Sequence, residues 1–265
     1  MDESDLRLSL SEVKRVVVKC GTRLLTDKHG KPDTNRISDL VSQIAELHKN
    51  GVEVILVSSG AVGMGIEKLG LSTRPTDLPA IQMAAAVGQV RLIAKYENLF
   101  SDRSIVTGQV LLIKEDLDNS ARAKNAHNTL SSMLKARVVP IVNENDVVSV
   151  AELKFGDNDL LAAMTANLMQ ADALVLLTTV DGVKSGLGSS AAKRISYAEK
   201  VNASLLDEAK GKTDALSMGG MESKLKSAEI AAKTGMLVVI ADGRKKNILN
   251  DIIDGKDTGT LIGSK

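Results

Sequence analysis

The chain has 265 residues, of which 43% are hydrophobic and 25% charged, and its formal net charge is +1. So balanced a charge excludes a bulk electrostatic field that would attract nucleic acid or anionic lipid, and an aromatic content of 2% leaves few rings on which single-stranded bases could stack. We therefore expect neither a nucleic-acid partner nor a membrane partner.

Two further features indicate a cytoplasmic protein. Residues 1–11 are acidic and lack the basic and then apolar pattern of a signal peptide, and no apolar run reaches the length of a membrane span. Cys20 is the only cysteine, so no internal disulfide can form, as is usual in a reducing compartment.

In chain order, short β-branched runs alternate with longer helical patterns. Apolar residues fill most of the predicted strands, as expected where a sheet is covered on both faces; these strands are residues 13–19, 52–57, 105–113, 138–143, 173–178 and 237–241. The predicted helices carry apolar residues at helical spacing; they are residues 34–50, 79–100, 120–136, 159–170 and 220–234. These repeated strand–helix–strand units predict an α/β fold with a largely parallel sheet and helices on both faces.

Several element ends are also marked in the sequence. Thr34 is expected to cap the start of the first helix, and Gly51 its end. Residues 182–190 are rich in Gly and Ser and predict either a lid or small subdomain, or a solvated surface excursion. Residues 259–263 are typical of a short closing strand. Because no low-complexity linker or internal repeat interrupts the chain, we expect a single domain over residues 1–265.

Glycine-rich turns follow the first two predicted strands, where open α/β sheets collect their ligands. No P-loop or well-placed dinucleotide-binding glycine motif is present. Lys19 instead leads into a turn at Gly21, which could bring a point charge and backbone amides to an anion; a solvated lysine at a strand edge is the commoner alternative. Residues 58–65 could likewise cradle an anion, or could simply allow close packing of a helix on the sheet.

Acidic and amide side chains gather in two neighbouring stretches, residues 141–146 and 156–159. They are joined by the alternating segment 147–155. Carboxylates and amides can hold a substrate ammonium group, orient lysines or ligate Mg²⁺. Asn and Asp also dominate ordinary turns, although two linked clusters are harder to explain in that way.

Two later turns suit a nucleotide. Residues 177–182 follow a predicted strand and could face the adenine or ribose, although Asp-Gly is also a common turn. Residues 218–224 open a predicted helix with paired glycines, whose free N–H groups could meet a phosphate, with Lys224 reaching back from one turn further on; a glycine hinge is the alternative. The three histidines have no metal-like spacing, so we expect no metal ligands in the protein.

Together these five segments resemble the amino acid kinase family, over residues 16–262. The resemblance is strongest to members that phosphorylate glutamate, and its most specific parts are residues 141–146 and 156–159; residues 84–89 are similar as well. It implies a three-layer αβα sandwich with a mainly parallel central sheet. It also implies transfer of a phosphoryl group from ATP, with Mg²⁺, to the side-chain carboxylate of L-glutamate, the first step of proline biosynthesis.

The resemblance also implies a role for each matching residue. Lys19 and Lys224 would contact the transferring phosphate, and Asp159 would hold both lysines in place. Glutamate would be bound by Ser59, Asp146 and Asn158, with Asp157 shaping the substrate end. The nucleotide site would be lined by Lys19, Thr178, Thr179, Met218, Gly219, Gly220, Met221 and Lys224.

Some expectations concern assembly and variation within the family. The resemblance implies a homo-oligomer, either a dimer or a tetramer, and feedback inhibition by proline. Many bacterial members carry a C-terminal PUA domain, which we do not expect in a chain of this length. Thr179 stands where many relatives have Asp, and Met218 where many have Thr, so both departures fall on the nucleotide side.

Overall fold

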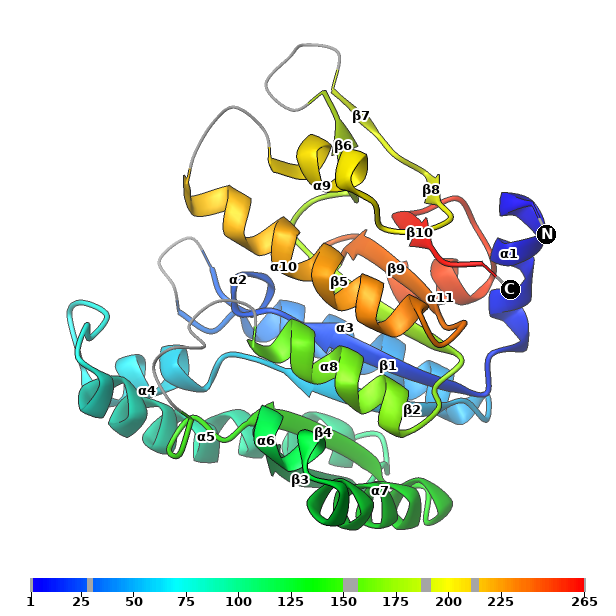
Figure 1. Cartoon of the computed structure of the whole chain (residues 1–265). Coiled ribbons are helices and arrows are strands. Elements are labelled where there is room, and N and C mark those ends of the chain that lie inside the picture. The colour runs from blue at the N-terminus through cyan, green and yellow to red at the C-terminus, as the bar shows by residue number, and fades with distance from the viewer. Residues whose placement is uncertain (1, 28–30, 150–156, 187–191, 211–214, 265) are drawn as a thin grey trace.

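The computed structural model describes residues 2–27, 31–149, 157–186, 192–210 and 215–264. Its centre is an eight-stranded sheet with the order β3-β4-β2-β1-β5-β9-β10-β8, flanked by helices on both faces (Figure 1). Neighbouring strands pair in parallel except β9 and β10, which are antiparallel. The strands are β1 Arg15–Cys20, β2 Glu53–Ser58, β3 Thr107–Leu112, β4 Val139–Glu144, β5 Ala173–Thr178, β8 Tyr197–Ala198, β9 Leu237–Asp242 and β10 Thr260–Ile262. The predicted three-layer αβα sandwich is confirmed.

Helices connect these strands and form the two outer layers. They are α1 Glu3–Leu8, α2 Thr22–Leu25, α3 Thr34–Lys49, α4 Ala61–Leu69, α5 Leu78–Ser101, α6 Lys114–Asp118, α7 Ser120–Lys135, α8 Asp157–Leu168, α9 Ala203–Lys210, α10 Ala215–Ala232 and α11 Ile248–Ile253, with a 3-10 turn at Ser9–Glu12. None of these described helices combines the length and the apolar character that a bilayer crossing needs.

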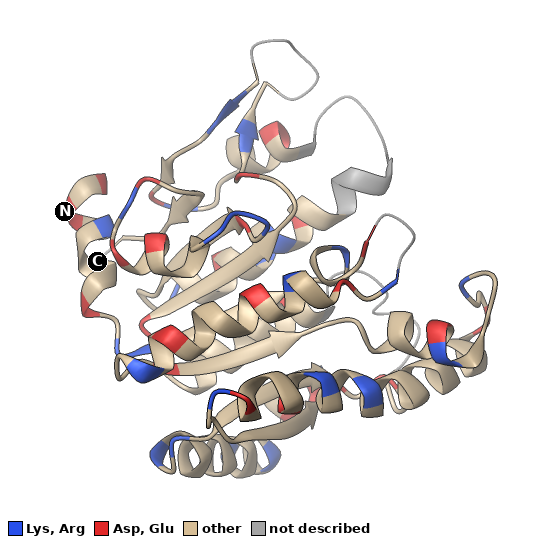
Figure 2. Cartoon of the chain, turned by 180° about the vertical axis from the view of Figure 1, so that it is seen from behind, with Lys and Arg blue, Asp and Glu red and all other residues tan. Residues whose placement is uncertain are grey.

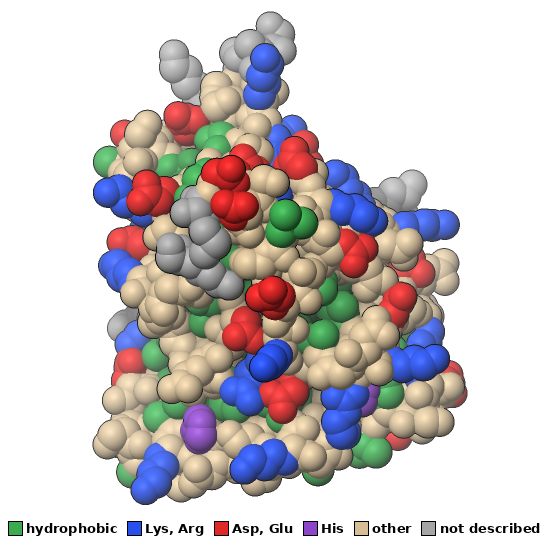
Figure 3. All heavy atoms as spheres, turned by 90° about the vertical axis from the view of Figure 1, so that its right-hand side faces the viewer, with side chains coloured by type: hydrophobic (Ala, Val, Ile, Leu, Met, Phe, Trp, Pro, Cys, Tyr) green, Lys and Arg blue, Asp and Glu red, His purple; other side chains and the backbone are tan. Residues whose placement is uncertain are grey.

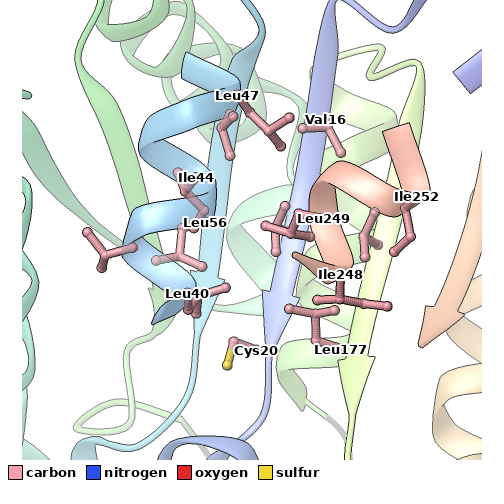
Figure 4. Packing of buried hydrophobic residues seen from close by; sticks show 14 of the residues in the cluster. Val16, Cys20, Leu40, Ile44, Leu47, Leu56, Leu177, Ile248, Leu249 and Ile252 are labelled. Atoms are coloured by element: carbon pink, nitrogen blue, oxygen red, sulfur yellow. The ribbon is translucent and has the colours of Figure 1, made fainter. Parts of the chain in front are cut away.

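The sheet separates two hydrophobic cores, because side chains alternate between the two faces of a strand. On β1, Val16, Val18 and Cys20 face one core and Val17 faces the other. Helices α3 and α11 cover the first face. Figure 4 shows Leu40, Ile44 and Leu47 of α3 and Ile248, Leu249 and Ile252 of α11 beside the strand residues Val16, Cys20, Leu56 and Leu177. The second core is covered by α7, α8, α9 and α10. Burial raises the pKa of the Cys20 thiol to about 12, so this residue serves as a small apolar side chain.

Several predicted element ends are wrong. Asp33, and not Thr34, caps α3, since its carboxylate accepts hydrogen bonds from the backbone N–H groups of Asn35 and Arg36. Strand β1 begins at Arg15 rather than at residue 13. Helix α10 begins at Ala215, five residues before the predicted start. The glycine pair at residues 219 and 220 therefore lies inside α10 rather than at its start.

The glycine-rich stretch after β5 forms a small hairpin. In it β6, Lys184–Ser185, pairs in antiparallel fashion with β7, Lys193–Arg194; residues 187–191 lie outside the described ranges, as does most of the predicted segment 147–155. The predicted closing strand is present as β10. It joins the sheet beside β9, and its Thr260 hydroxyl accepts a hydrogen bond from the Val183 N–H, which ties the hairpin to the sheet.

Helices α4 and α5 pack with their backbones in contact. A Cβ atom at Gly88 would lie 1.8 Å from the carbonyl oxygen of Ala61, and one at Gly65 would lie 1.8 Å from that of Ala84. Only glycine fits at such a contact. Gly65 therefore allows close packing of α4 on α5, whereas the sequence had suggested that a glycine here would allow a helix to pack closely on the sheet.

Charges of both signs are mixed over the surface. Figure 2 shows Lys, Arg, Asp and Glu along helices and loops, whereas the central strands carry few of them. The face in Figure 3 shows basic and acidic side chains next to one another, with no broad area of one sign. This mixture agrees with the net charge of +1.

Candidate active site

Three charged side chains meet in the layer between β1, α8 and α10. The Lys19 Nζ atom lies 2.5 Å from Oδ1 of Asp159, and the Lys224 Nζ atom lies 3.0 Å from Oδ2 of the same carboxylate. All three side chains are largely buried, with 7%, 12% and 3% exposure for Lys19, Lys224 and Asp159. The structure thus brings together residues that are far apart in the sequence.

Local folding explains how each member arrives. Lys19 lies on the same face of β1 as Val17, which is the face covered by α8 and α10. Asp159 is in the first turn of α8, and Lys224 is inside α10, from which its Nζ atom also donates to the carbonyl oxygen of Gly220 at 3.3 Å. At Gly21 a Cβ atom would lie 3.2 Å from Nζ of Lys19, so the glycine leaves room for the ammonium group.

The electrostatics of this cluster favour an anion. Burial alone would raise the pKa of Asp159, but Lys19 and Lys224 outweigh it and hold that pKa below the usual value. The pKa of Lys224 is lowered, because burial and the charges of Lys19 and Arg23 outweigh the attraction of Asp159. One carboxylate between two lysines leaves surplus positive charge, which a bound anion would neutralise.

A second cluster, of amides and a hydroxyl, adjoins the first. Asn158 directly precedes Asp159, and its Nδ2 donates to Ser59 Oγ at 2.8 Å and to Asn143 Oδ1 at 3.0 Å. The backbone N–H of Ser59 donates to the carbonyl oxygen of Cys20 at 3.0 Å, which sets Ser59 beside the Gly21 turn. Two of the three predicted glutamate-binding residues are therefore in direct contact, next to the lysines.

Asp146 follows β4 at the same carboxyl edge of the sheet, two residues beyond Glu144. Burial and the charge of Glu144 raise the pKa of Asp146 to about 6, although Arg74 acts in the opposite direction. Such a carboxylate would be stabilised by a cationic ligand. Asp157, the fourth residue predicted for the substrate, begins α8, and its side chain lies outside the described part of the structure.

The predicted nucleotide residues divide into two groups. The first group follows β5: Thr178 ends this strand beside the carboxyl end of β1, and half-buried Thr179 comes next. The carbonyl oxygen of Thr178 accepts a hydrogen bond from the Gly243 N–H at 2.9 Å. The second group lies in α10. Gly219 and Gly220 lie inside α10 and not at its start, so their expected free N–H groups are a wrong prediction. Met221 packs against the second hydrophobic core, the one covered by α7, α8, α9 and α10. The side chain of Met218 lies outside the described part of the structure.

Three residues contribute to the site although no individual role was predicted for them: Arg23, Asn143 and Gln89. Arg23 is close enough to influence Lys224, and it follows the predicted Gly21 turn by two residues. Asn143 is 2% exposed and contacts Asn158, while Gln89 of α5 contacts Asn143. Asn143 belongs to the amide and acidic stretch 141–146 that the sequence marked, although no role was predicted for it, whereas Gln89 lies in residues 84–89, which only resembled the family.

Comparisons of sequence identify the relatives of the chain. The model of the amino acid kinase family matches residues 14–242. Glutamate 5-kinase from Clostridium tetani is 42% identical over 257 residues, covering 96% of each chain, and that from Clostridium acetobutylicum is 43% identical over 255 residues, again covering 96% of each. Glutamate 5-kinase from Chromohalobacter salexigens is 42% identical over 98% of this chain and 69% of the relative.

Solved structures support the fold. A UMP kinase from Bacillus anthracis superposes with a TM-score of 0.63 at 16% identity, covering 95% of this chain and 96% of that one. A carbamate kinase from Giardia lamblia bound to AMP-PNP superposes with a TM-score of 0.66 at 18% identity, covering 96% of this chain and 100% of that one. At such low identity these two neighbours bear on the fold alone.

Proposed function

The chain belongs to the amino acid kinase family, and we propose that it acts as a glutamate 5-kinase, which transfers the γ-phosphoryl group of ATP to the side-chain carboxylate of L-glutamate. The product is γ-glutamyl phosphate, made in the first step of proline biosynthesis. The observation that carries this proposal is Asp159 held between Lys19 and Lys224, beside the Asn158–Ser59 pair. This places surplus positive charge next to polar groups suited to a small amino acid.

The reaction needs charge compensation more than a base. A Glu side-chain carboxylate, with a pKa of about 4.3, is already ionised at neutral pH. Its approach to a triphosphate is opposed by repulsion, ~4 kcal/mol for two unit charges ~4 Å apart at an effective dielectric of ~20. Lys19 and Lys224 would offset this repulsion and stabilise the charge on the phosphoryl oxygens. Asp159 would hold the ammonium groups of both lysines close together, so that both could contact the same phosphoryl group.

The residues present fit ATP that carries its own metal. Within the described ranges, no three His, Cys, Asp or Glu side chains gather closely enough to hold a metal ion. Mg²⁺ in such enzymes binds largely through substrate phosphates and water, so a protein cage is not needed. When bound, Mg²⁺ would neutralise part of the phosphate charge. Thr178, Thr179 and residues 218–224 of α10 would line the nucleotide side.

The glutamate would be held at both ends. Asp146 would attract the ammonium group, and Ser59 and Asn158 would position a carboxylate. We also propose that the chain works in the cytoplasm as a single domain that forms a dimer or tetramer, and that proline inhibits it. These four proposals rest on the family resemblance, and the buried free thiol of Cys20 bears on the compartment alone.

The raised pKa of Asp146 gives a testable pH dependence. As pH falls through about 6, the carboxyl group gains a proton and loses its attraction for an ammonium group, so kcat/KM for glutamate is expected to fall. The acceptor carboxylate, with a pKa of about 4.3, does not titrate in this range. Asp146→Asn should have a low kcat/KM without this acidic limb, measured by initial rates from about pH 5 to 8. A limb that persists in Asp146→Asn would assign the titration to another group.

Trapping the acyl phosphate tests the function itself. Hydroxylamine converts an acyl phosphate to a hydroxamate, so the purified chain with ATP, Mg²⁺ and glutamate should form hydroxamate in step with ADP. Aspartate, N-acetylglutamate, carbamate and UMP serve as competing acceptors in the same assay. ADP formation that prefers one of these over glutamate would replace the proposed substrate.

A further inference from the structure

A chain of side-chain hydrogen bonds links α5 to the proposed substrate site. Asn143 Nδ2 donates to Gln89 Oε1 at 2.8 Å, Asn158 Nδ2 donates to Asn143 Oδ1 at 3.0 Å, and Asn158 Nδ2 also donates to Ser59 Oγ at 2.8 Å. We call Gln89, Asn143, Asn158 and Ser59 the amide relay. It joins residues from α5, β4, α8 and the turn before α4.

The direction of the relay is fixed at one end by the backbone. The N–H of Glu144 donates to Oδ1 of Asn158 at 3.3 Å, so the NH₂ group of Asn158 must point to Ser59 and Asn143. Asn143 then donates from its own NH₂ group to Gln89, so Gln89 must turn its Oε1 atom toward Asn143 to accept this hydrogen bond. As a result the Nε2 atom of Gln89 points away from Asn143, where it is buried and has no hydrogen-bond partner within the described residues. A buried donor without a partner is costly, yet this orientation is the one that satisfies Asn143.

Backbone packing fixes where Gln89 stands. The neighbouring Gly88 brings α5 so close to Ala61 that a Cβ atom would lie 1.8 Å from the Ala61 carbonyl oxygen. Ala61 begins α4, two residues after Ser59. The two ends of the relay are therefore held against each other by direct helix–helix contact, and Gln89 is a rigid support for the polar groups in between.

We propose that Gln89 is a positioning residue of the substrate site, which anchors the Asn143 side chain so that Asn143 Oδ1 holds the Asn158 NH₂ group in place beside Ser59. In that orientation Ser59 Oγ accepts a hydrogen bond from Asn158, so the Ser59 hydroxyl proton is left to be donated to a substrate carboxylate. The relay thereby makes Ser59 a donor and favours an anionic group at this position. This inference rests on the proposed glutamate kinase activity.

Removing the acceptor of Gln89 is the first test. Gln89→Met keeps the length of the side chain but offers Asn143 only a thioether sulfur, a much weaker acceptor than an amide oxygen, so Asn143 no longer holds the Asn158 side chain firmly in place. We expect KM for glutamate to rise about tenfold, with kcat and KM for ATP unchanged within about twofold, by hydroxamate and ADP assays. Gln89→Glu keeps an acceptor oxygen and should restore a glutamate KM near that of the wild type. Glu97→Met, at an exposed position on the same helix, is the matched control and should change nothing.

A double-mutant cycle separates positioning from a general packing effect. If Gln89 acts through Asn158, adding Gln89→Met to Asn158→Ala should raise the glutamate KM no further. Full additivity, an equal rise in KM for ATP, or a normal glutamate KM in folded Gln89→Met would each overturn the inference. Thermal unfolding reports on folding, and Gln89→Asn, which shortens the amide by one methylene, replaces Gln89→Met if that variant does not fold. A wild-type chain that is inactive with glutamate would overturn the proposed function together with this inference.

Discussion

Lys224→Ala is expected to lower kcat about a hundredfold or more, the effect of removing one preorganised group that stabilises transition-state charge. The chain should remain folded, because Asp159 keeps its contact with Lys19. Steady-state rates at saturating ATP and glutamate measure the loss, and thermal unfolding checks the fold. Lys19→Ala should behave in the same way, with some added instability because that side chain is 7% exposed.

The same helix offers a matched control for Lys224. Lys226 lies two residues further on, is 63% exposed and pairs with Glu222 on the surface. Lys226→Ala removes an equal charge from α10 at a place where solvent screens it, so kcat should stay at the wild-type value. Near-normal turnover in folded Lys224→Ala, or an equal loss in Lys226→Ala, would contradict the phosphate role of Lys224.

Asp159→Asn is expected to have the largest effect on stability. It leaves the ammonium groups of Lys19 and Lys224 buried without their carboxylate, and breaking a buried ion pair from one side costs about 3–5 kcal/mol. The free energy of unfolding in urea measures this loss. Turnover should fall too, because the two lysines repel each other and lose their common orientation.

The cause of that instability can be tested by a second substitution and by pH. Adding Lys224→Met to Asp159→Asn removes one unpaired cation, so the double variant should be more stable than Asp159→Asn alone. A lysine whose folded-state pKa is depressed, as that of Lys224 is, destabilises the fold fully below that pKa, and this penalty shrinks as pH rises from the folded-state pKa to the higher unfolded-state pKa. Asp159→Asn should therefore approach the wild type in stability at alkaline pH. A double variant less stable than the single one would point to lost packing.

The fold was largely predictable because its pattern is local. Strands such as β5, Ala173–Thr178, are buried on both faces and are apolar almost throughout, and α3 repeats apolar residues at helical spacing. Element ends were less predictable, since adjacent residues competed. Asp33 and Thr34 can each cap a helix, and only the backbone path shows which one does. Helix α10 extends back to Ala215 through residues that a glycine pair had marked as a break.

The sequence predicted several residues of the site, but it did not predict which of them contact one another. Resemblance to the amino acid kinase family pointed to Lys19, Asp159 and Lys224, and the structure places both lysines within hydrogen-bonding distance of Asp159. It could not reveal the amide relay, because Gln89 and Asn143 are 54 positions apart and meet only once α5 packs beside β4. Nor could it reveal the influence of Arg23 on Lys224.

The sequence alone determined the alternation of strands and helices, the parallel sheet and the carboxyl edge at which ligands gather, since these follow from periodic burial and from glycine after strands. Tertiary structure alone decided the strand order, the start of α10 and the pairing of one carboxylate with two lysines. The physical reason is the distance along the chain over which each interaction acts. Periodicity and capping act within a few residues, whereas the charges and amides of this site interact across distances that only the folded chain makes short.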